Sequence, residues 1–141
     1  MADYIATVPS AWSREDTFDY LADFRNVAEW DPSMERAELI SGEPGKVGST
    51  YRLTMSVLGV STNLDYETVE VQRPERLVMV SESDAMTSTD TIRVDADSSV
   101  TYFAHLDLHG LRKAADPLAE VLLERVSDRA AKSLAAKLGG S

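Results

Sequence analysis

The last part of the chain carries the pattern that most constrains its fold. From Leu118 to Leu138, apolar residues recur at every fourth position, and charged residues occupy much of the remainder. This spacing predicts an amphipathic helix of roughly 22 residues, about 33 Å long at 1.5 Å per residue. Asp116-Pro117 suits its N-cap and first helical position, and Gly139-Gly140 suits its end. A helix of this length needs an apolar partner along its whole length.

The segment before this helix has the character of a β-meander. Between residues 34 and 108, short runs rich in β-forming residues are separated by turn signals such as Gly59 and Arg73-Pro74-Glu75. Short strands joined by short polar turns favour antiparallel pairing. The expected strands are Met34–Ser41, Thr50–Leu58, Val60–Gln72, Arg76–Glu82, Thr87–Val94 and Val100–Leu108.

The N-terminal segment adds one strand and two short helices. Tyr4–Val8 carries β-formers, and Ser13 suits a helix N-cap because acidic residues follow it in the first turn. Two short helices are expected from Ser13 to about Glu29, and Trp30-Asp31-Pro32 ends them because the residue before a proline avoids the helical region. The predicted fold class is α+β: a curved antiparallel sheet of about seven strands around a long C-terminal helix, with two short helices after the first strand.

Composition and charge exclude several classes of function. The 141 residues include no cysteine, which excludes a disulfide framework, thiolate metal sites and a cysteine nucleophile, and fits a reducing compartment. The formal net charge of −10 disfavours nucleic acid and anionic membranes as partners. No signal peptide or membrane-spanning run is visible. We expect a single cytoplasmic domain over residues 1–141 without membrane insertion, and the sequence leaves homodimerisation open.

Four stretches occur in an order and at a spacing that together carry a family resemblance. They are Phe18–Asn26 leading into Trp30-Asp31-Pro32, then Gly45–Tyr51, then Pro74–Val78, and finally Val100-Thr101-Tyr102 followed by Gly110 and Pro117. In these stretches the chain resembles the START-like superfamily, also called SRPBCC or the polyketide cyclase/dehydrase and lipid-transport proteins. The resemblance covers about residues 3–138. It implies a helix-grip fold with a pocket between sheet and C-terminal helix, but it implies no particular reaction.

Strand parity predicts which side chains face this pocket. Alternate residues of a strand share one face, so the apolar residues of 51–57 and of 100–108 are expected to face the long helix. An apolar lining with a few phenolic hydroxyls suits a ligand that is mostly carbon with one or two oxygens. The predicted ligand-binding residues are Trp30, Tyr51, Leu53, Met55, Leu64, Tyr66, Met79, Asp90, Tyr102, Leu106, Leu118, Leu122 and Val126.

Among the charged residues on strands, Asp90 is the best candidate for an inward acid. It has the parity of Ile92 and Val94, and a carboxylate that faces an apolar pocket has a raised pKa and can act as an acid or a base. His105 has the parity of Phe103, opposite to Tyr102, which points the imidazole toward the convex, solvent-facing side.

Two further features lead to specific expectations. The glycine-rich loop Gly42–Gly48 precedes a strand rather than a helix, so it is interpreted as a lid over the pocket mouth and not as a phosphate-binding loop. In the long strand Val60–Gln72, Tyr66 and Val69 have opposite parity, yet both are expected to be buried. A β-bulge in this strand would exchange its inward and outward residues.

The leading hypothesis is a protein that binds a small hydrophobic or amphipathic molecule, such as a lipid, a polyketide-like aromatic or an isoprenoid. A second hypothesis is a polyketide aromatase/cyclase or dehydrase, with Tyr66, Tyr102, Asp90 and Arg93 as the first candidates for acid–base chemistry. A third is a regulatory interaction module with a filled core and no ligand. The sequence contains no nucleophile elbow and no zinc-binding histidine pair, so no catalytic residue, metal or cofactor is assigned.

Overall fold

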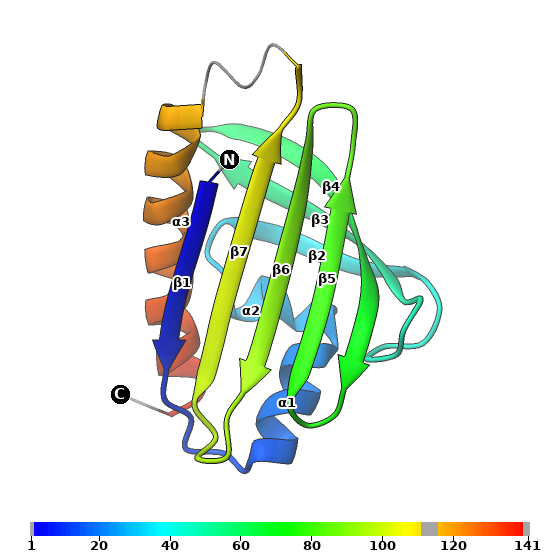
Figure 1. Ribbon diagram of the computed structural model, residues 1–141, viewed down its shortest axis with the longest axis vertical. Helices are drawn as coiled ribbons and strands as arrows, with labels where there is room; N and C mark the ends of the chain where they lie inside the picture. The colour runs from blue at the N-terminus through cyan, green and yellow to red at the C-terminus, as the bar shows by residue number, and fades with distance from the viewer. Residues whose placement is uncertain (1, 111–115, 140–141) are drawn as a thin grey trace.

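The computed structural model describes residues 2–110 and 116–139, without the side chains of residues 2, 116–120 and 122. Within these residues, seven strands form one antiparallel sheet in the order β1-β7-β6-β5-β4-β3-β2. Figure 1 shows the sheet bending round, so that β2 and β3 cross behind β6 and β7. The predicted curved antiparallel sheet is therefore confirmed. The strands are β1 (Ala2–Val8), β2 (Met34–Ser41), β3 (Thr50–Val57), β4 (Val60–Gln72), β5 (Arg76–Glu82), β6 (Met86–Val94) and β7 (Val100–Leu108).

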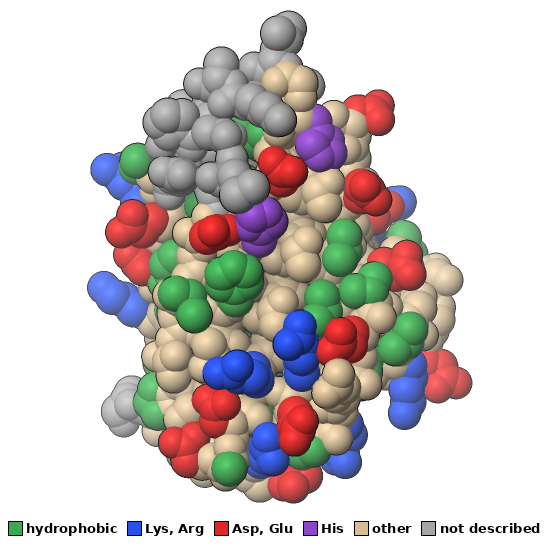
Figure 2. Space-filling view, in the orientation of Figure 1, with side chains coloured by type: hydrophobic (Ala, Val, Ile, Leu, Met, Phe, Trp, Pro, Cys, Tyr) green, Lys and Arg blue, Asp and Glu red, His purple; other side chains and the backbone are tan. Residues whose placement is uncertain are grey.

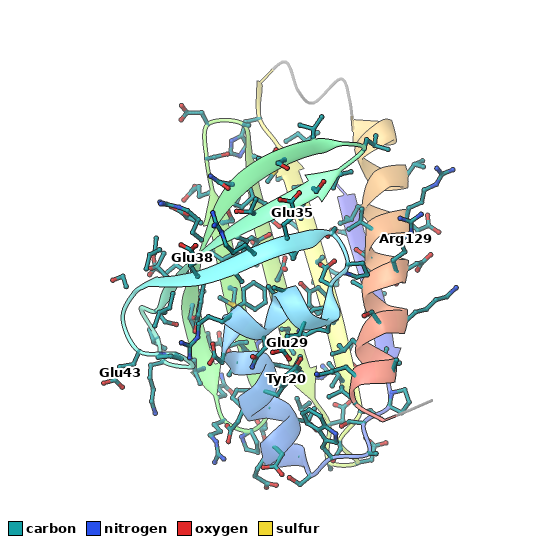
Figure 3. The ribbon with its side chains drawn as sticks, turned by 180° about the vertical axis from the view of Figure 1, so that it is seen from behind. Tyr20, Glu29, Glu35, Glu38, Glu43 and Arg129 are labelled. Atoms are coloured by element: carbon teal, nitrogen blue, oxygen red, sulfur yellow. The ribbon has the colours of Figure 1, made fainter. Side chains whose placement is uncertain are left out.

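The helices cover the concave side of the sheet. The long helix α3 (Asp116–Lys137) runs alongside β1, as both Figure 1 and Figure 3 show. The short elements α1 (Arg14–Ala22), η1 (Phe24–Asn26) and α2 (Val27–Trp30) lie beside its C-terminal half. This arrangement is the helix grip that the sequence predicts, with two short α-helices and a 3-10 turn after the first strand.

Capping interactions fix both ends of the helical layer. The Ser13 hydroxyl oxygen accepts a hydrogen bond from the Asp16 N–H at 3.1 Å, as predicted for an N-cap. After α3, Gly139 has a φ of +78°, the left-handed conformation that glycine adopts at helix ends. Leu138 is fully buried, and its carbonyl accepts a hydrogen bond from the Ala11 N–H at 2.9 Å. The end of α3 is thereby tied to the segment that follows β1.

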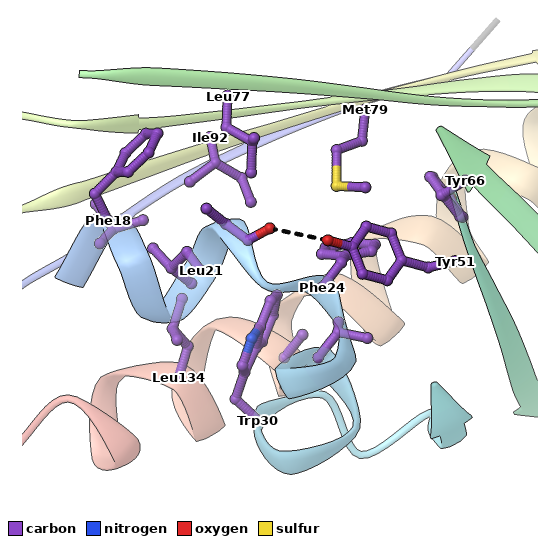
Figure 4. Close-up of a cluster of buried hydrophobic side chains, with 14 of the residues drawn as sticks. Phe18, Leu21, Phe24, Trp30, Tyr51, Tyr66, Leu77, Met79, Ile92 and Leu134 are labelled. Carbon is purple, nitrogen blue, oxygen red and sulfur yellow. Dashed lines mark hydrogen bonds between the residues drawn. The ribbon is translucent and has the colours of Figure 1, made fainter. Parts of the chain in front are cut away.

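One end of the concave face is solidly packed. Side chains from α1 and η1 meet apolar side chains from the strands and from the end of α3, and Figure 4 shows this cluster. Its members include Phe18, Leu21, Phe24, Tyr51, Leu77, Ile92 and Leu134, none of which is more than 2% exposed. This dense packing anchors the short helices to the sheet.

The long strand β4 contains an irregularity of the kind expected from its sequence. Leu64, Tyr66 and Thr68 alternate as buried residues, and the register with β5 then shifts between Thr68 and Glu70. A shift of this kind is a β-bulge, which changes the face that later residues occupy. Val69 lies at the shift and is 44% exposed, so its expected burial is wrong.

The hairpin between β3 and β4 turns through two residues. Leu58 and Gly59 both have positive φ, at +54° and +78°, while Val57 and Val60 pair on either side. A two-residue hairpin with both central φ angles positive favours Asn-Gly, whereas an isobutyl side chain at the first position is strained. The Leu58 side chain is 81% exposed, so little packing offsets this strain.

We expect Leu58→Asn to raise the free energy of unfolding by about 1 kcal/mol, because asparagine adopts the left-handed region at lower cost than leucine. Urea unfolding measures the change. Leu58→Ala is the matched control, since it removes the exposed side chain but keeps a Cβ in the strained conformation. An asparagine variant no more stable than the alanine variant would contradict the strain argument.

Candidate functional site

A cavity of about 290 Å³ lies between α3 and the concave face of the sheet. Strands β1, β3, β4, β6 and β7 form one wall, and the C-terminal two-thirds of α3 forms the other. Trp30 and Asp31, at the end of α2, close one side together with Met34 from β2. The cavity therefore lies where the sequence predicts a pocket, between the sheet and the long helix.

Eight of the predicted ligand-binding residues line this cavity, and they come from elements far apart in the chain. They are Trp30, Met55, Leu64, Tyr66, Asp90, Tyr102, Leu106 and Val126. Their convergence follows from the alternation on the strands, which directs every second side chain to the concave face.

Three predicted residues do not line the cavity. Tyr51, Leu53 and Met79 are fully buried in the solid part of the core. The Tyr51 hydroxyl accepts a hydrogen bond from the Gly45 N–H at 3.1 Å, and its ring packs edge-on against Phe24. Parity identified the correct face of these strands, but the short helices fill the space above this part of the face. The side chains of the remaining two, Leu118 and Leu122, lie outside the described residues.

A chain of hydrogen bonds converges on Asp90 inside the otherwise apolar cavity. The Tyr102 hydroxyl donates to one carboxylate oxygen, and the Ser88 hydroxyl donates to the other at 3.4 Å. Ser88 in turn accepts a hydrogen bond from the Tyr66 hydroxyl at 3.1 Å. The β-strand geometry explains the arrangement, because Ser88 and Asp90 share one face of β6. The four residues Tyr66, Ser88, Asp90 and Tyr102 are called the polar cluster below.

Burial dominates the acid–base properties of the polar cluster. It raises the pKa of the Asp90 carboxyl to about 6, against the hydrogen bonds from Tyr102 and Ser88, which favour the ionised form. Burial, followed by the nearby charge of Asp90, raises the pKa of Tyr102 well above its ordinary value. Asp90 therefore changes protonation state close to neutral pH, while Tyr102 keeps its proton.

Asp31 is a second acid on the cavity wall. It is only 9% exposed, and one of its carboxylate oxygens accepts hydrogen bonds from the Ser33 N–H at 2.9 Å and the Ser33 hydroxyl at 2.7 Å. Burial raises the pKa of Asp31, which Ser33 partly offsets. The neighbouring Trp30 ring packs edge-on against Tyr102, with ring centroids 5.9 Å apart. Asp31 thus lies on the same cavity as the polar cluster.

Sequence reasoning missed several lining residues. Asp31 belongs to the Trp30-Asp31-Pro32 stretch that ends the short helices and carries part of the family resemblance, but it is not among the predicted contacts, and neither is Ser88, although Ser88 has the parity of Asp90. Ala130 and Leu134 continue the four-residue spacing of α3 and also line the cavity. Extending the parity of β6 and the spacing of α3 would have identified three of these four.

Arg93, a candidate for acid–base chemistry, lies on the opposite face of β6. Its side chain is 59% exposed and forms an ion pair with Asp95 at 3.4 Å. His105 also lies away from the cavity, as predicted, and its imidazole pairs with Asp3 on the adjacent β1. The outer face of the sheet carries scattered charged side chains of both signs, as Figure 2 shows.

The predicted lid is also wrong. No residue of the Gly42–Gly48 loop lines the cavity, and the loop is held by the Gly45 contact to Tyr51 and by a hydrogen bond from the Gly48 N–H to the Thr68 carbonyl at 2.9 Å. The loop lies at the packed end of the sheet, because it leads into Thr50 at the start of β3, whereas the β3 residues that line the cavity begin only at Met55. The loop therefore packs against the core and does not cover an opening of the cavity.

The described residues contain no group of three or more histidine or acidic side chains placed to hold a metal ion. None of the described helices is both long and apolar enough to cross a membrane.

Comparison with known proteins identifies relatives by family and by fold. A family model described as "Polyketide cyclase / dehydrase and lipid transport" matches residues 1–139. No curated protein matches the chain.

Among solved structures, the chain is similar to the Zhui aromatase/cyclase from Streptomyces sp. R1128, with a TM-score of 0.79 at 15% identity, covering 97% of this chain and 93% of that one. It is also similar to a START superfamily protein from Mycobacterium smegmatis, with a TM-score of 0.75 at 16% identity and coverages of 99% and 97%. The major latex-like protein 151 from Panax ginseng has a TM-score of 0.75 at 15% identity, with 96% of each chain covered. At these identities the similarity establishes a shared fold.

Replacing Asp90 should change the pH dependence of stability. Because its pKa rises from the ordinary 3.8 to about 6 on folding, Asp90 contributes stability that is fully present below pH 3.8 and lost as the pH rises through about 6. The wild type should therefore lose on the order of 3 kcal/mol of unfolding free energy relative to Asp90→Asn as the pH rises between these values. Urea unfolding of both proteins across this range measures the difference.

The exposed Asp84 provides the control for that experiment, because Asp84→Asn removes the same charge outside the cavity. If the difference between wild type and Asp90→Asn stayed constant with pH, Asp90 would not titrate as the buried carboxyl described here.

Proposed function

The chain belongs to the polyketide cyclase/dehydrase and lipid transport family, and on this premise we propose that it binds one small, largely apolar molecule in the cavity between the sheet and α3. The family and the fold support a hydrophobic ligand-binding or polyketide cyclase-type protein. The narrower proposal is that binding in this cavity is the protein's principal activity.

The observation that carries the proposal is the cavity itself. Protein interiors are normally packed without voids of this size, and the adjacent end of the same concave face is packed in that way. A volume of about 290 Å³ is close to twice that of an engineered apolar cavity of about 150 Å³ that binds benzene. The cavity therefore suits a compact skeleton of about two fused rings, or an aliphatic molecule of similar volume.

Apolar contact would supply most of the affinity. Met55, Leu64, Leu106 and Val126 provide the hydrophobic lining, and Trp30 provides an aromatic face. Burying apolar surface contributes about 25 cal/mol per Å². In this proposal the polar cluster fixes the orientation of the ligand through its oxygens. Leu118 and Leu122 stay predicted contacts, since their side chains lie outside the described residues.

Filling part of the cavity should weaken binding without unfolding the protein. Ala104 lies on the wall, between Tyr102 and Leu106 on β7, and is 6% exposed. We expect Ala104→Phe to weaken binding of a naphthalene probe by about tenfold to a hundredfold, since a ligand loses contacts worth roughly 1.5–3 kcal/mol when one side chain occupies its space. Calorimetric titration measures the affinity, and native mass spectrometry of freshly purified protein detects any molecule already bound.

Ala136→Phe is the matched control, because Ala136 is an exposed residue of α3. It should leave probe binding unchanged. Equal binding by the wild type and Ala104→Phe would show that the probe binds elsewhere, and the proposal would then be wrong.

A specific observation also favours a second candidate, an enzyme of the cyclase or dehydrase type. Asp90 has a pKa of about 6 and accepts a hydrogen bond from Tyr102 within the cavity, so it can take up or release a proton near neutral pH. In this role Asp90 would be the general base and Tyr102 its partner. A loss of turnover in Asp90→Asn that greatly exceeds any change in ligand affinity would distinguish this activity from binding alone. The cavity argues against the third hypothesis, which predicts a filled core.

A further inference from the structure

The geometry of the polar cluster points to the chemistry of the ligand's polar end: we infer that the cavity selects a molecule that donates a hydrogen bond, such as an alcohol or a phenol, and rejects one that ends in a carboxylate. This inference rests on the proposed function and narrows it to a class of ligand.

The direction of the hydrogen bonds carries the argument. Tyr102 donates its only hydroxyl hydrogen to Asp90, and Ser88 donates its own to the same carboxylate. Tyr66 donates to Ser88, so its hydrogen is also engaged. What the polar cluster presents to the cavity is therefore lone pairs on oxygen. A ligand group can satisfy them only by donating a hydrogen.

Asp31 reinforces this preference. One of its carboxylate oxygens accepts both hydrogen bonds from Ser33, and among the described residues no side chain or backbone group donates to the other oxygen. Asp31 is 91% buried, given its 9% exposure, and it lines the same cavity as Asp90. Both acids thus offer unused acceptor capacity toward a bound molecule.

Among the described residues, the lining contributes no group that could neutralise an anionic ligand. The described lining residues include no lysine, arginine or histidine. The Tyr4 hydroxyl already donates to Asp128 at 2.7 Å. The other polar groups on the lining, the Trp30 indole N–H and the Ser127 hydroxyl, are neutral. A carboxylate placed here would be desolvated beside two acids without a counter-charge, which is strongly unfavourable.

The volume of the cavity sets the probes for a test. Three molecules share the naphthalene skeleton and differ in their polar group: 2-naphthol donates a hydrogen bond, 2-methoxynaphthalene only accepts one, and 2-naphthoate carries a carboxylate. Calorimetric titration at about pH 8 keeps Asp90 ionised, because its pKa is about 6. We expect 2-naphthol to bind about tenfold or more tightly than 2-methoxynaphthalene, and 2-naphthoate to bind most weakly.

The Asp90→Asn variant tests the assignment to the polar cluster. Asparagine keeps the shape of the side chain but replaces one acceptor oxygen with a donor NH2 group and removes the charge. In this variant we expect the preference for 2-naphthol to fall to about threefold or less, and 2-naphthoate to gain affinity. Asp84→Asn, on an exposed residue, should keep the wild-type order.

Titration of the wild type at about pH 5 tests the same point without a substitution. Protonated Asp90 carries a hydrogen that it can donate, so the advantage of 2-naphthol over 2-methoxynaphthalene should shrink. Besides Asp90, the titratable groups on the described lining are Tyr4 from β1, Tyr66 from β4, Tyr102 from β7 and Asp31 after α2, and the described residues of α3 on the lining are uncharged. None of the tyrosines ionises in this range, because burial raises all three pKa values.

The outcomes separate the two proposals. Equal affinity for the three probes, or tightest binding of 2-naphthoate, would overturn the inference about the polar end while leaving cavity binding in place. A wild-type preference for 2-naphthol that persists unchanged in Asp90→Asn and at the lower pH would also overturn it. Failure of all three probes to bind would overturn both the inference and the proposed function.

Discussion

The concave face of the sheet must be covered along its whole width, because apolar side chains from each strand point into it. In the described residues that face spans seven strands, which is wider than one 22-residue helix can cover. The segment from α1 to α2 therefore packs on one part and α3 on another, and the two coverings meet near Trp30 and Leu134. Beyond this meeting point the helices do not fill the concave side of the sheet, and the unfilled space is the cavity. The curvature of the sheet and the division of its covering together determine where a ligand could lie.

Local patterns in the sequence were sufficient for the elements and for the faces of the strands. The four-residue spacing of α3, the cap at Ser13 and the alternation around Asp90 each depend on neighbours in the chain, and the structure agrees with them. Where along a strand the cavity begins is a tertiary property. Tyr51 and Met55 have the same parity on β3, yet only Met55 lines the cavity, because η1 packs over Tyr51. A bulge in β4 was expected from the opposite parity of Tyr66 and Val69, but the exposure of Val69 depends on the pairing with β5, which periodicity within β4 does not encode.

The polar cluster places buried polar groups, which reduce the stability of the fold, in the part of the molecule that is least well packed. A buried carboxyl and an unfilled cavity each reduce stability, and the packed end of the same face offsets that cost. Asp90 and Asp31 therefore do not serve stability, since an apolar residue of similar size at either position would stabilise the domain more. The structure thus separates a densely packed half of the core, around Phe24 and Leu77, from a half that encloses the cavity.

The pairing of β1 with β7 has a consequence for the order in which the molecule forms. Asp3 and His105, which face each other across these strands, are 102 residues apart in the chain. Closing so long a loop costs conformational entropy before the strand pairing can offset that cost, and folds dominated by such distant pairings form slowly. On the ribosome, β1 has no partner until β7 has been synthesised. The strand of this sheet that is synthesised first therefore joins it among the last, and α3, made later still, packs against that strand and completes the cavity wall.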